Sequence, residues 1–516
     1  MPLFPSTIRR RDFLRSAVVP LLPVQAPAIV PADRSRPLIT HGIQSADVST
    51  DRATVWARTD RTARMIVEYA GDERFASPVR LRGPVATSAT DFTAQLDLSG
   101  LPGGRPVFYR IWFESDGNPP ATSEPQTGSF RTAPVTDRRV RLAWSADTVG
   151  QGWGINQAFG GLRLYETMGR QDPDLFVHSG DQIYADAPLP ERVPLADGTV
   201  WTNLVTPAKS RIAETLDDYR GNFAYNRLDA HALRFSASVP LVAQWDDHEV
   251  TNNWYPDERL ADERYTERRV SLLAERARQA MSEWVPRRGG SGSRIYRRIG
   301  YGPALELFVL DCRSHRAANG PNLEGVRTPR TAMLGNAQLG WLEDALEQSP
   351  ATWKVIANDM PIGLVVEDGV IGGVPHFEGW ANSNDGPALG RELELARILS
   401  HIKRRGIQNV VWITGDVHYA AAHYYDPARA RFTDFLPFWE FVAGPMHAGT
   451  FGPGRLDATF GPEAKFVSVP DGMPQNRPPS DGLQFFGTLD CDAKRLTATI
   501  WNLAGEKLWS TELEAM

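Results

Sequence analysis

The sequence is poor in cysteine, with only Cys312 and Cys491 among its 516 residues. A disulfide framework is therefore excluded as the main source of stability. One disulfide between the two is an open alternative. Cys312 lies in an apolar run typical of a core strand, however, so we expect two separate buried thiols.

The chain also has no excess of basic residues: its formal net charge is -6 and its pI is about 6.0. This balance argues against a nucleic-acid-binding protein. No apolar stretch has the length of a transmembrane helix. Apolar residues make up 42% of the chain and aromatic residues 10%, which is enough for a large globular core.

Several catalytic motifs are absent: an HExxH helix, a phosphate-binding GxxxxGKS/T loop, a GxSxG elbow and clustered cysteines of a zinc site. Their absence disfavours serine and ATP chemistry. It leaves metal-assisted chemistry as the main option.

The first thirty residues are typical of a targeting segment. Arginines at positions 9–11 precede an apolar stretch at 17–30 that contains a small-residue site at 26–28. The pair Arg10-Arg11, followed by Phe13 and Leu14, is typical of a twin-arginine export signal. We expect residues 1–30 to direct export, so that the protein is periplasmic, cell-surface or secreted, and the twin-arginine machinery to be a partner.

Two different patterns divide the rest of the chain. Residues 37–132 alternate like short strands between turns, which predicts a β-sandwich domain. Residues 140–516 have buried strands alternating with amphipathic segments, which predicts an α/β core. Helices are expected at 257–284, 339–348 and 390–405, and an antiparallel strand pair at 484–513.

Polar residues follow these buried strands where each strand ends. In α/β sheets, ligands bind at the carboxyl ends of strands, so these side chains are expected to share one site. They are Asp147, Asp181 with Tyr184, Asp246-Asp247-His248-Glu249, Asn358-Asp359, and Asp416 with His418.

This mixture of carboxylates and imidazoles suits a centre of two cations. Asp181 is the natural bridging ligand, because it lies between an earlier ligand strand and a later one. Taken singly, Asp147 would more readily be a helix cap, Tyr184 a core aromatic and His418 a structural histidine. The joint occurrence at consecutive strand ends favours the metal site.

The ordered segments SADTVGQGWGIN, SGDQIYAD, WDDHEVTNNW, LDCRSHR, ITGDVHYA and EFVAGPMHAGTFGP resemble the motifs of the PhoD-like alkaline phosphatases. The segment HGIQSADVSTDRATVWARTDR resembles that family's fibronectin-like first domain. The resemblance covers nearly the whole chain after residue 30. It implies a calcineurin-like metallophosphoesterase sandwich of class α/β (α+β), preceded by an all-β fibronectin-like domain.

The resemblance also implies a ligand set. Asp147, Asp181, Tyr184 and His418 would hold Fe(3+), and Asp181, Asp247, Asn358 and Asp416 would hold one or two Ca(2+) ions, with other divalent metals as alternatives. His248, beside Asp247, would contact the phosphoryl oxygens or protonate the leaving group. Some family members have a cysteine at the first position, where this chain has Asp147.

Several choices stay open at this point. Asp247 is preferred to Asp246 by register alone, Asn252 or Asn253 could contribute instead, and either Asn358 or Asp359 could be the ligand. Arg313 is equally a bidentate phosphate clamp or a salt-bridge residue. His447 is a candidate for the pocket wall.

The predicted function is that of an exported alkaline phosphatase, which hydrolyses phosphate monoesters or diesters by attack of a metal-activated hydroxide. Its substrate would be a small phosphate ester, and cell-surface or lipid substrates are further candidates. The alternatives are a phosphodiesterase of phospholipase D type and, from another class, a secreted binding protein without activity.

Overall fold

The N-terminal part of the chain is an all-β sandwich, as expected. The computed structural model describes residues 36–117, 119–290 and 292–516. Side chains of β6 alternate between half-buried and buried along the strand, because one face covers the core. One sheet contains β1 (Ile39–Ala46), β2 (Arg52–Thr59) and β5 (Thr93–Ser99). The other has the order β4-β3-β6-β7, with β3 (Ala63–Ala70), β4 (Val79–Ala86), β6 (Pro106–Glu114) and β7 (Gln126–Arg131).

The remainder is built on two large mixed sheets that pack face to face around one core. The first has the order β24-β23-β22-β8-β9-β12-β1-β2-β5 and adds β8 (Val140–Ser145), β9 (Leu175–His178), β12 (Leu241–Ala243), β22 (Phe485–Cys491), β23 (Arg495–Asn502) and β24 (Lys507–Glu514). The second has the order β13-β14-β15-β18-β20-β19-β21, made of β13 (Arg297–Gly300), β14 (Leu305–Val309), β15 (Trp353–Ala357), β18 (Val410–Thr414), β20 (Phe438–Val442), β19 (Ala421–Tyr425) and β21 (Pro462–Val467).

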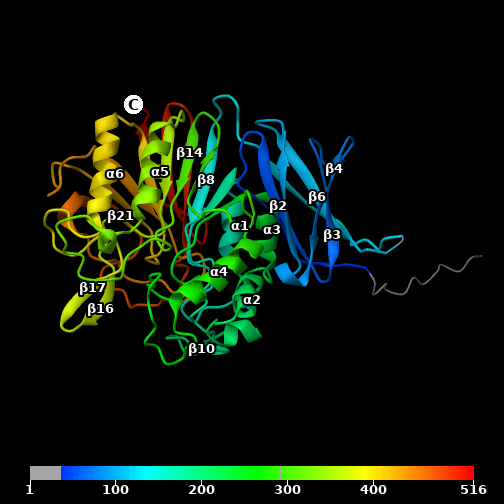
Figure 1. Cartoon of the computed structure of the whole chain (residues 1–516), viewed down its shortest axis with the longest axis horizontal. Helices are drawn as coiled ribbons and strands as arrows, with labels where there is room; N and C mark the ends of the chain where they lie inside the picture. The colour runs from blue at the N-terminus through cyan, green and yellow to red at the C-terminus, as the bar shows by residue number, and fades with distance from the viewer. Residues whose placement is uncertain (1–35, 118, 291) are drawn as a thin grey trace, which may run out of the picture.

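Helices cover the outer faces of both sheets (Figure 1). The nine-stranded sheet is covered by α1 (Arg163–Gly169), α2 (Leu216–Asn226), α3 (Ala230–Ser238) and α4 (Val270–Trp284). The seven-stranded sheet is covered by α5 (Gly335–Glu347) and α6 (Glu392–Arg405). Successive side chains of β18 point to opposite faces of this sheet. Trp412 packs under these two helices, and its neighbours Val411 and Ile413 lie in the core between the two sheets. The expected sandwich of two sheets with helices on both outer faces is therefore observed.

One helix prediction and one strand prediction need correction. The helix expected over 257–284 begins only at Val270, because the charged residues before it offer no continuous apolar face, and there the backbone N–H of Leu260 donates to Arg268 O at 2.8 Å. Residues 484–513 contain β22, β23 and most of β24, so three strands replace the expected pair. Cys312 and Cys491 are buried and free, as expected.

The sandwich and the α/β part share a sheet. Strand β1 pairs in parallel with β12 through Ala46 and Leu241, and the N–H of Asp47 donates to Leu241 O at 3.1 Å. Along the chain, the residues between 132 and 140 form a linker between the two parts. In space the two parts are continuous, because the nine-stranded sheet contains strands from both sides of this linker.

Two short hairpins extend from this framework: β10 (Arg192–Pro194) with β11 (Val200–Thr202), and β16 (Glu367–Ile371) with β17 (Val374–Phe377). The expected export signal at 1–30 lies outside the described residues. Among the residues that the structure does describe, no helix is long and apolar enough to cross a membrane.

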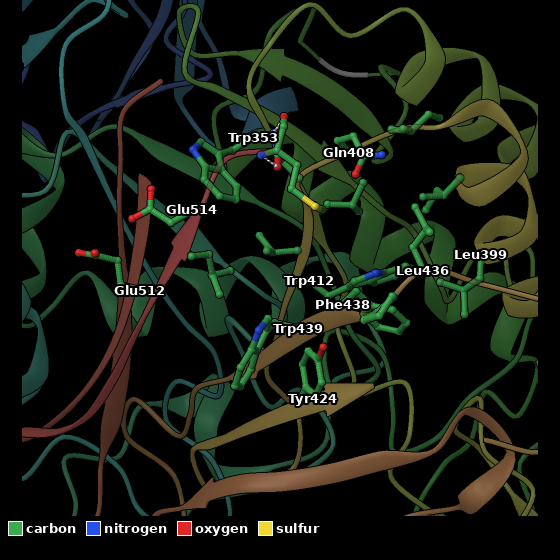
Figure 2. A pocket seen from close by; sticks show the side chains of 18 residues that line it. Trp353, Leu399, Gln408, Trp412, Tyr424, Leu436, Phe438, Trp439, Glu512 and Glu514 are labelled. Carbon is green, nitrogen blue, oxygen red and sulfur yellow. Dashed lines mark hydrogen bonds between the residues drawn. The ribbon is translucent and has the colours of Figure 1, made fainter. Parts of the chain in front are cut away.

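A cavity of about 550 Å³ opens at the amino ends of β15, β18 and β20 (Figure 2). Its aromatic lining residues are Trp353, Trp412, Tyr424, Phe438 and Trp439. The polar residues singled out from the sequence follow the opposite, carboxyl ends of these strands. The cavity is therefore separate from the candidate site.

Candidate metal centre

The polar residues expected at strand ends come together where the carboxyl ends of both large sheets meet. Asp147 follows β8, Asp181 follows β9, Asp247 follows β12, and Asp416 follows β18. Parallel strands end at the same edge of a sheet, so the loops after them converge. The site therefore takes its residues from both sheets of the sandwich.

Four of the candidate ligands have a left-handed backbone. The φ angles are 66° at Asp147, 53° at Asp181, 70° at Asp416 and 61° at His418. Residues other than glycine rarely adopt this conformation, and it persists where the surrounding structure fixes it. Tight left-handed turns directly after the strands hold these side chains at the edge of the sheets.

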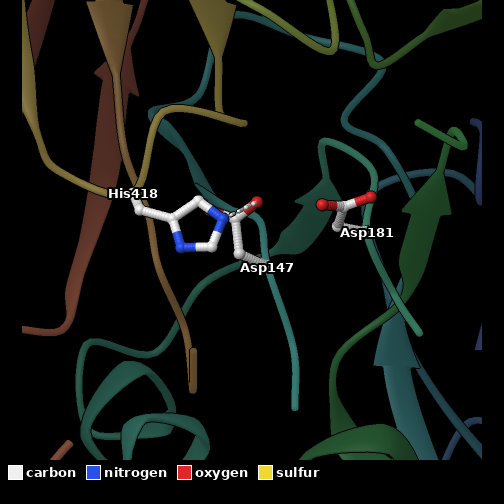
Figure 3. A group of neighbouring side chains, drawn as sticks. All are labelled: Asp147, Asp181 and His418. Atoms are coloured by element: carbon white, nitrogen blue, oxygen red, sulfur yellow. Dashed lines mark ion pairs between the residues drawn. The ribbon is translucent and has the colours of Figure 1, made fainter. Parts of the chain in front are cut away.

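The ligand atoms form three overlapping groups, within each of which they lie no more than 4.8 Å apart. The groups are Asp147 with Asp181 and His418 (Figure 3), Asp181 with Asp247 and His248, and Asp246 with Asp247 and Asp416. Asp181 and Asp247 each belong to two groups. Shared carboxylates of this kind suit neighbouring cations.

Several carboxylate oxygens of the site lack a hydrogen-bond partner although they are buried. Both oxygens of Asp147, Oδ1 of Asp247 and Oδ2 of Asp246 are buried without a hydrogen bond. Burial is the largest cause that raises the pKa of Asp147 and Asp181 well above the ordinary value, and neighbouring carboxylates add to it at Asp181. Bound cations would satisfy these oxygens, so the donor set fits a metal centre.

The candidate ligand His418 is neutral. Its Nδ1 lies at hydrogen-bond distance from the carbonyl oxygen of Gly449, which can only accept, so Nδ1 carries the proton. Its Nε2 lies 2.8 Å from Oη of Tyr184. Burial lowers the pKa of His418 to about 4, which keeps the ring neutral. The lone pair of Nε2 and the Tyr184 oxygen therefore meet at one point beside Asp147.

His248 is held by a residue that the sequence interpretation missed. Its Nδ1 lies 2.8 Å from Oδ1 of Asp186, and its ring stacks on Tyr184 with centroids 4.3 Å apart. Burial works against the charged ring, but the carboxylates of Asp186 and Asp247 outweigh it and raise the pKa of His248 to about 10. Asp186 lies in the quoted segment SGDQIYAD, and its spacing of five residues from Asp181 was the available signal.

Glu249 is a second residue whose role was missed. Its Oε2 accepts from the backbone N–H groups of Asp181 at 3.1 Å and Asp246 at 2.7 Å, and its Oε1 accepts from Gln182 at 2.6 Å. One buried carboxylate thus connects the loops after β9 and β12. It positions candidate ligands without being near enough to share a group with them.

The choice between Asn358 and Asp359 stays a prediction. Oδ1 of Asn358 accepts from Cys312 Sγ at 2.9 Å, and its Nδ2 donates to Met360 O. Oδ2 of Asp359 has no hydrogen bond and lies 3.6 Å from Nε of Arg313. Both side chains are fully buried beside the site.

Arg313 is completely buried and bound to carboxylates. Its Nε donates to Oδ1 of Asp246 at 2.7 Å, and its Nη1 donates to Oε2 of Glu378 at 2.6 Å. With these donors engaged, the guanidinium is placed to balance acidic side chains. This arrangement favours the salt-bridge alternative over the phosphate clamp.

Replacing Arg313 should therefore act mainly on stability. We expect Arg313→Met to lower the free energy of unfolding by about 3–5 kcal/mol, because it leaves buried carboxylates without their counter-charge. Urea denaturation checks this, with Arg495→Met, at the exposed pair with Glu512, as a control that changes it by less than about 1 kcal/mol. Unchanged stability with a raised KM for a phosphate ester would favour the clamp.

His447 lies behind the site and not among the ligands. Its Nε2 is 3.0 Å from Gly154 O, and its backbone carbonyl accepts from the N–H of Val149 at 2.8 Å. The ring packs near Trp201 and Phe159. Burial lowers the pKa of His447 to about 4. The residue thus supports the loop that carries Asp147.

Acid should weaken this support. The folded-state pKa of His447 lies below the unfolded value of 6.5, so its neutral form contributes stability that is present above pH 6.5 and lost as the pH falls toward 4. Wild type should lose about 3 kcal/mol more than His447→Gln between pH 7.5 and pH 4, measured by urea denaturation. Equal losses in both proteins would contradict this account.

Comparison with known proteins adds a family relationship. Residues 142–500 match the model of PhoD-like phosphatase, and residues 24–134 match that of the PhoD-like phosphatase N-terminal domain. Alkaline phosphatase D of Bacillus subtilis (strain 168) is 28% identical over an alignment of 404 residues, and the match covers 73% of this chain and 64% of that protein. The match thus spans less than two thirds of this curated relative.

Solved structures show the same fold. The structure of PhoD superposes with a TM-score of 0.68 at 22% identity, covering 94% of this chain and 90% of that one. The purple acid phosphatase PPD1 from yellow lupin (Lupinus luteus) seeds gives a TM-score of 0.55 at 12% identity, covering 93% and 74%. Both likenesses extend over the sandwich and the α/β part together.

Proposed function

This chain belongs to the PhoD-like phosphatase family, and on that premise we propose that it is a metal-dependent phosphoric ester hydrolase of the alkaline phosphatase D type. The observation that carries the proposal is the set of three candidate ligand groups, which Asp181 and Asp247 link into one chain because each belongs to two of the groups. A binding protein without activity has no need of such a buried set. The substrate would be a small phosphate monoester or diester.

The proposed metals are Fe(3+) and Ca(2+). Asp147, Asp181, Tyr184 and His418 offer carboxylate, phenol and imidazole, a donor set that suits a ferric ion. Asp181, Asp247, Asn358 and Asp416 offer oxygen donors only, which suits calcium. Asp147 supplies a hard oxygen where some relatives supply a thiolate, so other divalent metals are alternatives that metal analysis of the purified protein decides.

When bound, such cations supply Lewis-acid activation of the phosphate ester and of the attacking water. The chain's own contribution centres on His248. Asp186 fixes its Nδ1 and leaves Nε2 directed to the side where Asp247 lies, 3.9 Å away. A protonated Nε2 can then donate to a phosphoryl oxygen or to the leaving ester oxygen.

The burial of the site adds to this effect. Asp147, Asp181 and Asp247 are at most 2% exposed. Few waters can reach such a centre, so hydrogen bonds and charges act there with little screening. The protein therefore provides fixed charges and a fixed proton donor, and substrate positioning supplies much of the remaining rate.

The test is hydrolysis of p-nitrophenyl phosphate and bis(p-nitrophenyl) phosphate by the purified protein at alkaline pH, with calcium and with chelator. We expect turnover that chelator removes and metal restores. The ratio of diester to monoester turnover chooses between a phosphatase and the phosphodiesterase of phospholipase D type. Protein that carries its metals and turns over neither substrate would contradict the proposal and favour the binding protein.

We also propose that the protein is exported by the twin-arginine machinery to the periplasm, the cell surface or the medium. The support is the sequence of residues 1–30, with Arg10-Arg11 before an apolar stretch. Cell fractionation should find the Arg10→Lys/Arg11→Lys variant retained inside and the wild type outside. Equal distribution of the two would contradict this route.

A further inference from the structure

The hairpin β16–β17 protrudes from the body of the molecule (Figure 1). Its tip carries exposed aliphatic side chains. Val370, Ile371 and Val374 are 67%, 63% and 44% exposed. Gly372 and Gly373, both with positive φ, make the turn between the strands. The run from Val370 to Pro375 contains no charged or hydrogen-bonding side chain.

The base of this hairpin is fixed next to the metal centre. Oδ1 of Asp368 accepts from Nδ2 of Asn253 at 2.8 Å, and its Oδ2 accepts from Nδ2 of Asn319 at 2.8 Å. The backbone N–H of Asn253 donates in turn to Oδ2 of Asp247 at 2.6 Å. Two hydrogen-bonded steps thus separate the hairpin from a candidate ligand. An isolated two-stranded hairpin is only marginally stable, so these contacts hold it in place.

We propose that the tip of β16–β17 inserts into a lipid surface and so brings the metal centre against phosphate esters held at that surface. The inference rests on the proposed phosphoesterase function and names the partner of the same site. Exposed aliphatic side chains favour the acyl boundary of a lipid layer, where their burial removes apolar area from water. The hairpin acts as an anchor beside the site.

Size and charge favour a lipid surface over a protein partner. A stable protein interface uses about 20–30 residues on each side, and the tip offers three aliphatic side chains. The hairpin carries Glu367 and Asp368 and no lysine or arginine. It therefore suits a zwitterionic surface, and its binding should change little with salt.

Vesicle binding is the first test. Full-length enzyme is floated with phosphatidylcholine vesicles and compared with the variant V370S/I371S/V374S. The matched control is V79S/V135S, which changes two exposed aliphatic residues of the N-terminal part. We expect wild type and control to bind alike. The tip variant should bind more weakly, by a factor of roughly ten or more, because three aliphatic side chains that would be buried in the lipid are lost.

Site-specific labelling places the contact. Both native cysteines are buried, so Ile371→Cys and Val135→Cys can each be labelled selectively with an environment-sensitive fluorophore. Vesicles should shift the emission at position 371 to shorter wavelength and leave that at position 135 unchanged. A shift at neither position would overturn the proposal, even if the tip variant binds less.

Turnover of water-soluble bis(p-nitrophenyl) phosphate separates this inference from the proposed function. The tip variant should keep wild-type turnover, and only its activity on vesicle-borne phosphate esters should fall. Vesicle binding that is equal in wild type and tip variant, or absent in both, overturns the lipid anchor whatever the activity. A concentration-dependent dimer that the tip variant loses would also overturn it, since the tip would then bind protein.

Discussion

Asp181→Asn is expected to lose most bound metal and to reduce kcat/KM by about 10³-fold or more, roughly 4 kcal/mol of barrier. Asp181 belongs to two ligand groups, so its replacement removes a negative charge from both. The asparagine keeps an oxygen for the N–H of His248, which donates to Oδ1 of Asp181 at 3.1 Å. The local backbone should therefore persist, and the loss should come from the missing charge.

The same variant should be more stable than wild type once metal is removed. Burial and neighbouring carboxylates raise the pKa of Asp181 far above the ordinary value, so its ionised form opposes folding of the metal-free protein. Ionised Asp181 lowers the free energy of unfolding of the metal-free protein. This loss is absent at low pH, where the carboxyl group is protonated, and it grows as the pH rises above the pKa of the unfolded state.

Metal content and urea denaturation with and without chelator check both parts. Asp490→Asn is the matched control, because Asp490 of β22 is also nearly buried but pairs with Arg141 of β8, away from the site. It should keep its metal. An Asp181→Asn protein with wild-type metal content and turnover would contradict the assignment.

Glu249→Ala should lower the free energy of unfolding by about 3–5 kcal/mol and metal affinity by about 10–100-fold. Three backbone N–H groups lose their common acceptor, and each unsatisfied buried donor costs about 1–3 kcal/mol. The loops that carry Asp181 and Asp246 then lose their connection. Replacing a residue that supports metal ligands in this way typically lowers metal affinity by about 10–100-fold.

Glu249→Gln separates the two effects. The amide keeps one accepting oxygen, so its stability should lie between wild type and Glu249→Ala. Glu306→Ala is the control: Glu306 is buried on β14, pairs with Arg298 at 3.7 Å and accepts no N–H of the ligand loops. It should leave metal affinity unchanged. Wild-type affinity in Glu249→Ala would show that the loops hold their positions without this carboxylate.

The strand ends could be predicted from the sequence because each is marked twice. A run such as NVVWIT reads as a buried strand, and the residues after it, Asp416 and His418, read as ligands. The convergence of these ends follows from the general geometry of α/β sheets. The α/β sandwich and the all-β N-terminal part were predictable in the same way.

The supporting contacts could not be predicted, because they depend on distances between loops. The segment WDDHE does not indicate that Glu249 accepts hydrogen bonds from three backbone N–H groups. Nor does it indicate that the nearby Asp247 belongs to the candidate metal centre. Arg313 was equally a clamp or a salt bridge in sequence, and only its fully buried position beside Asp246 and Glu378 separates the two. A local sequence pattern indicates which polar residues lie at the site. It does not indicate which hydrogen-bond or ion-pair partners they have.

The pairing of β1 with β12 has a consequence for how this chain can be cut and recombined. Ala46 pairs with Leu241, so the N-terminal sandwich is joined to the strands that precede Asp181 and Asp247 by backbone pairing between distant parts of the chain. A fragment that starts at residue 140 would expose the apolar strand Leu241–Ala243 as an open edge, which invites association with other copies. Chimeras should therefore take β1 and β12 from the same parent, although the linker near residue 136 is the obvious place to cut.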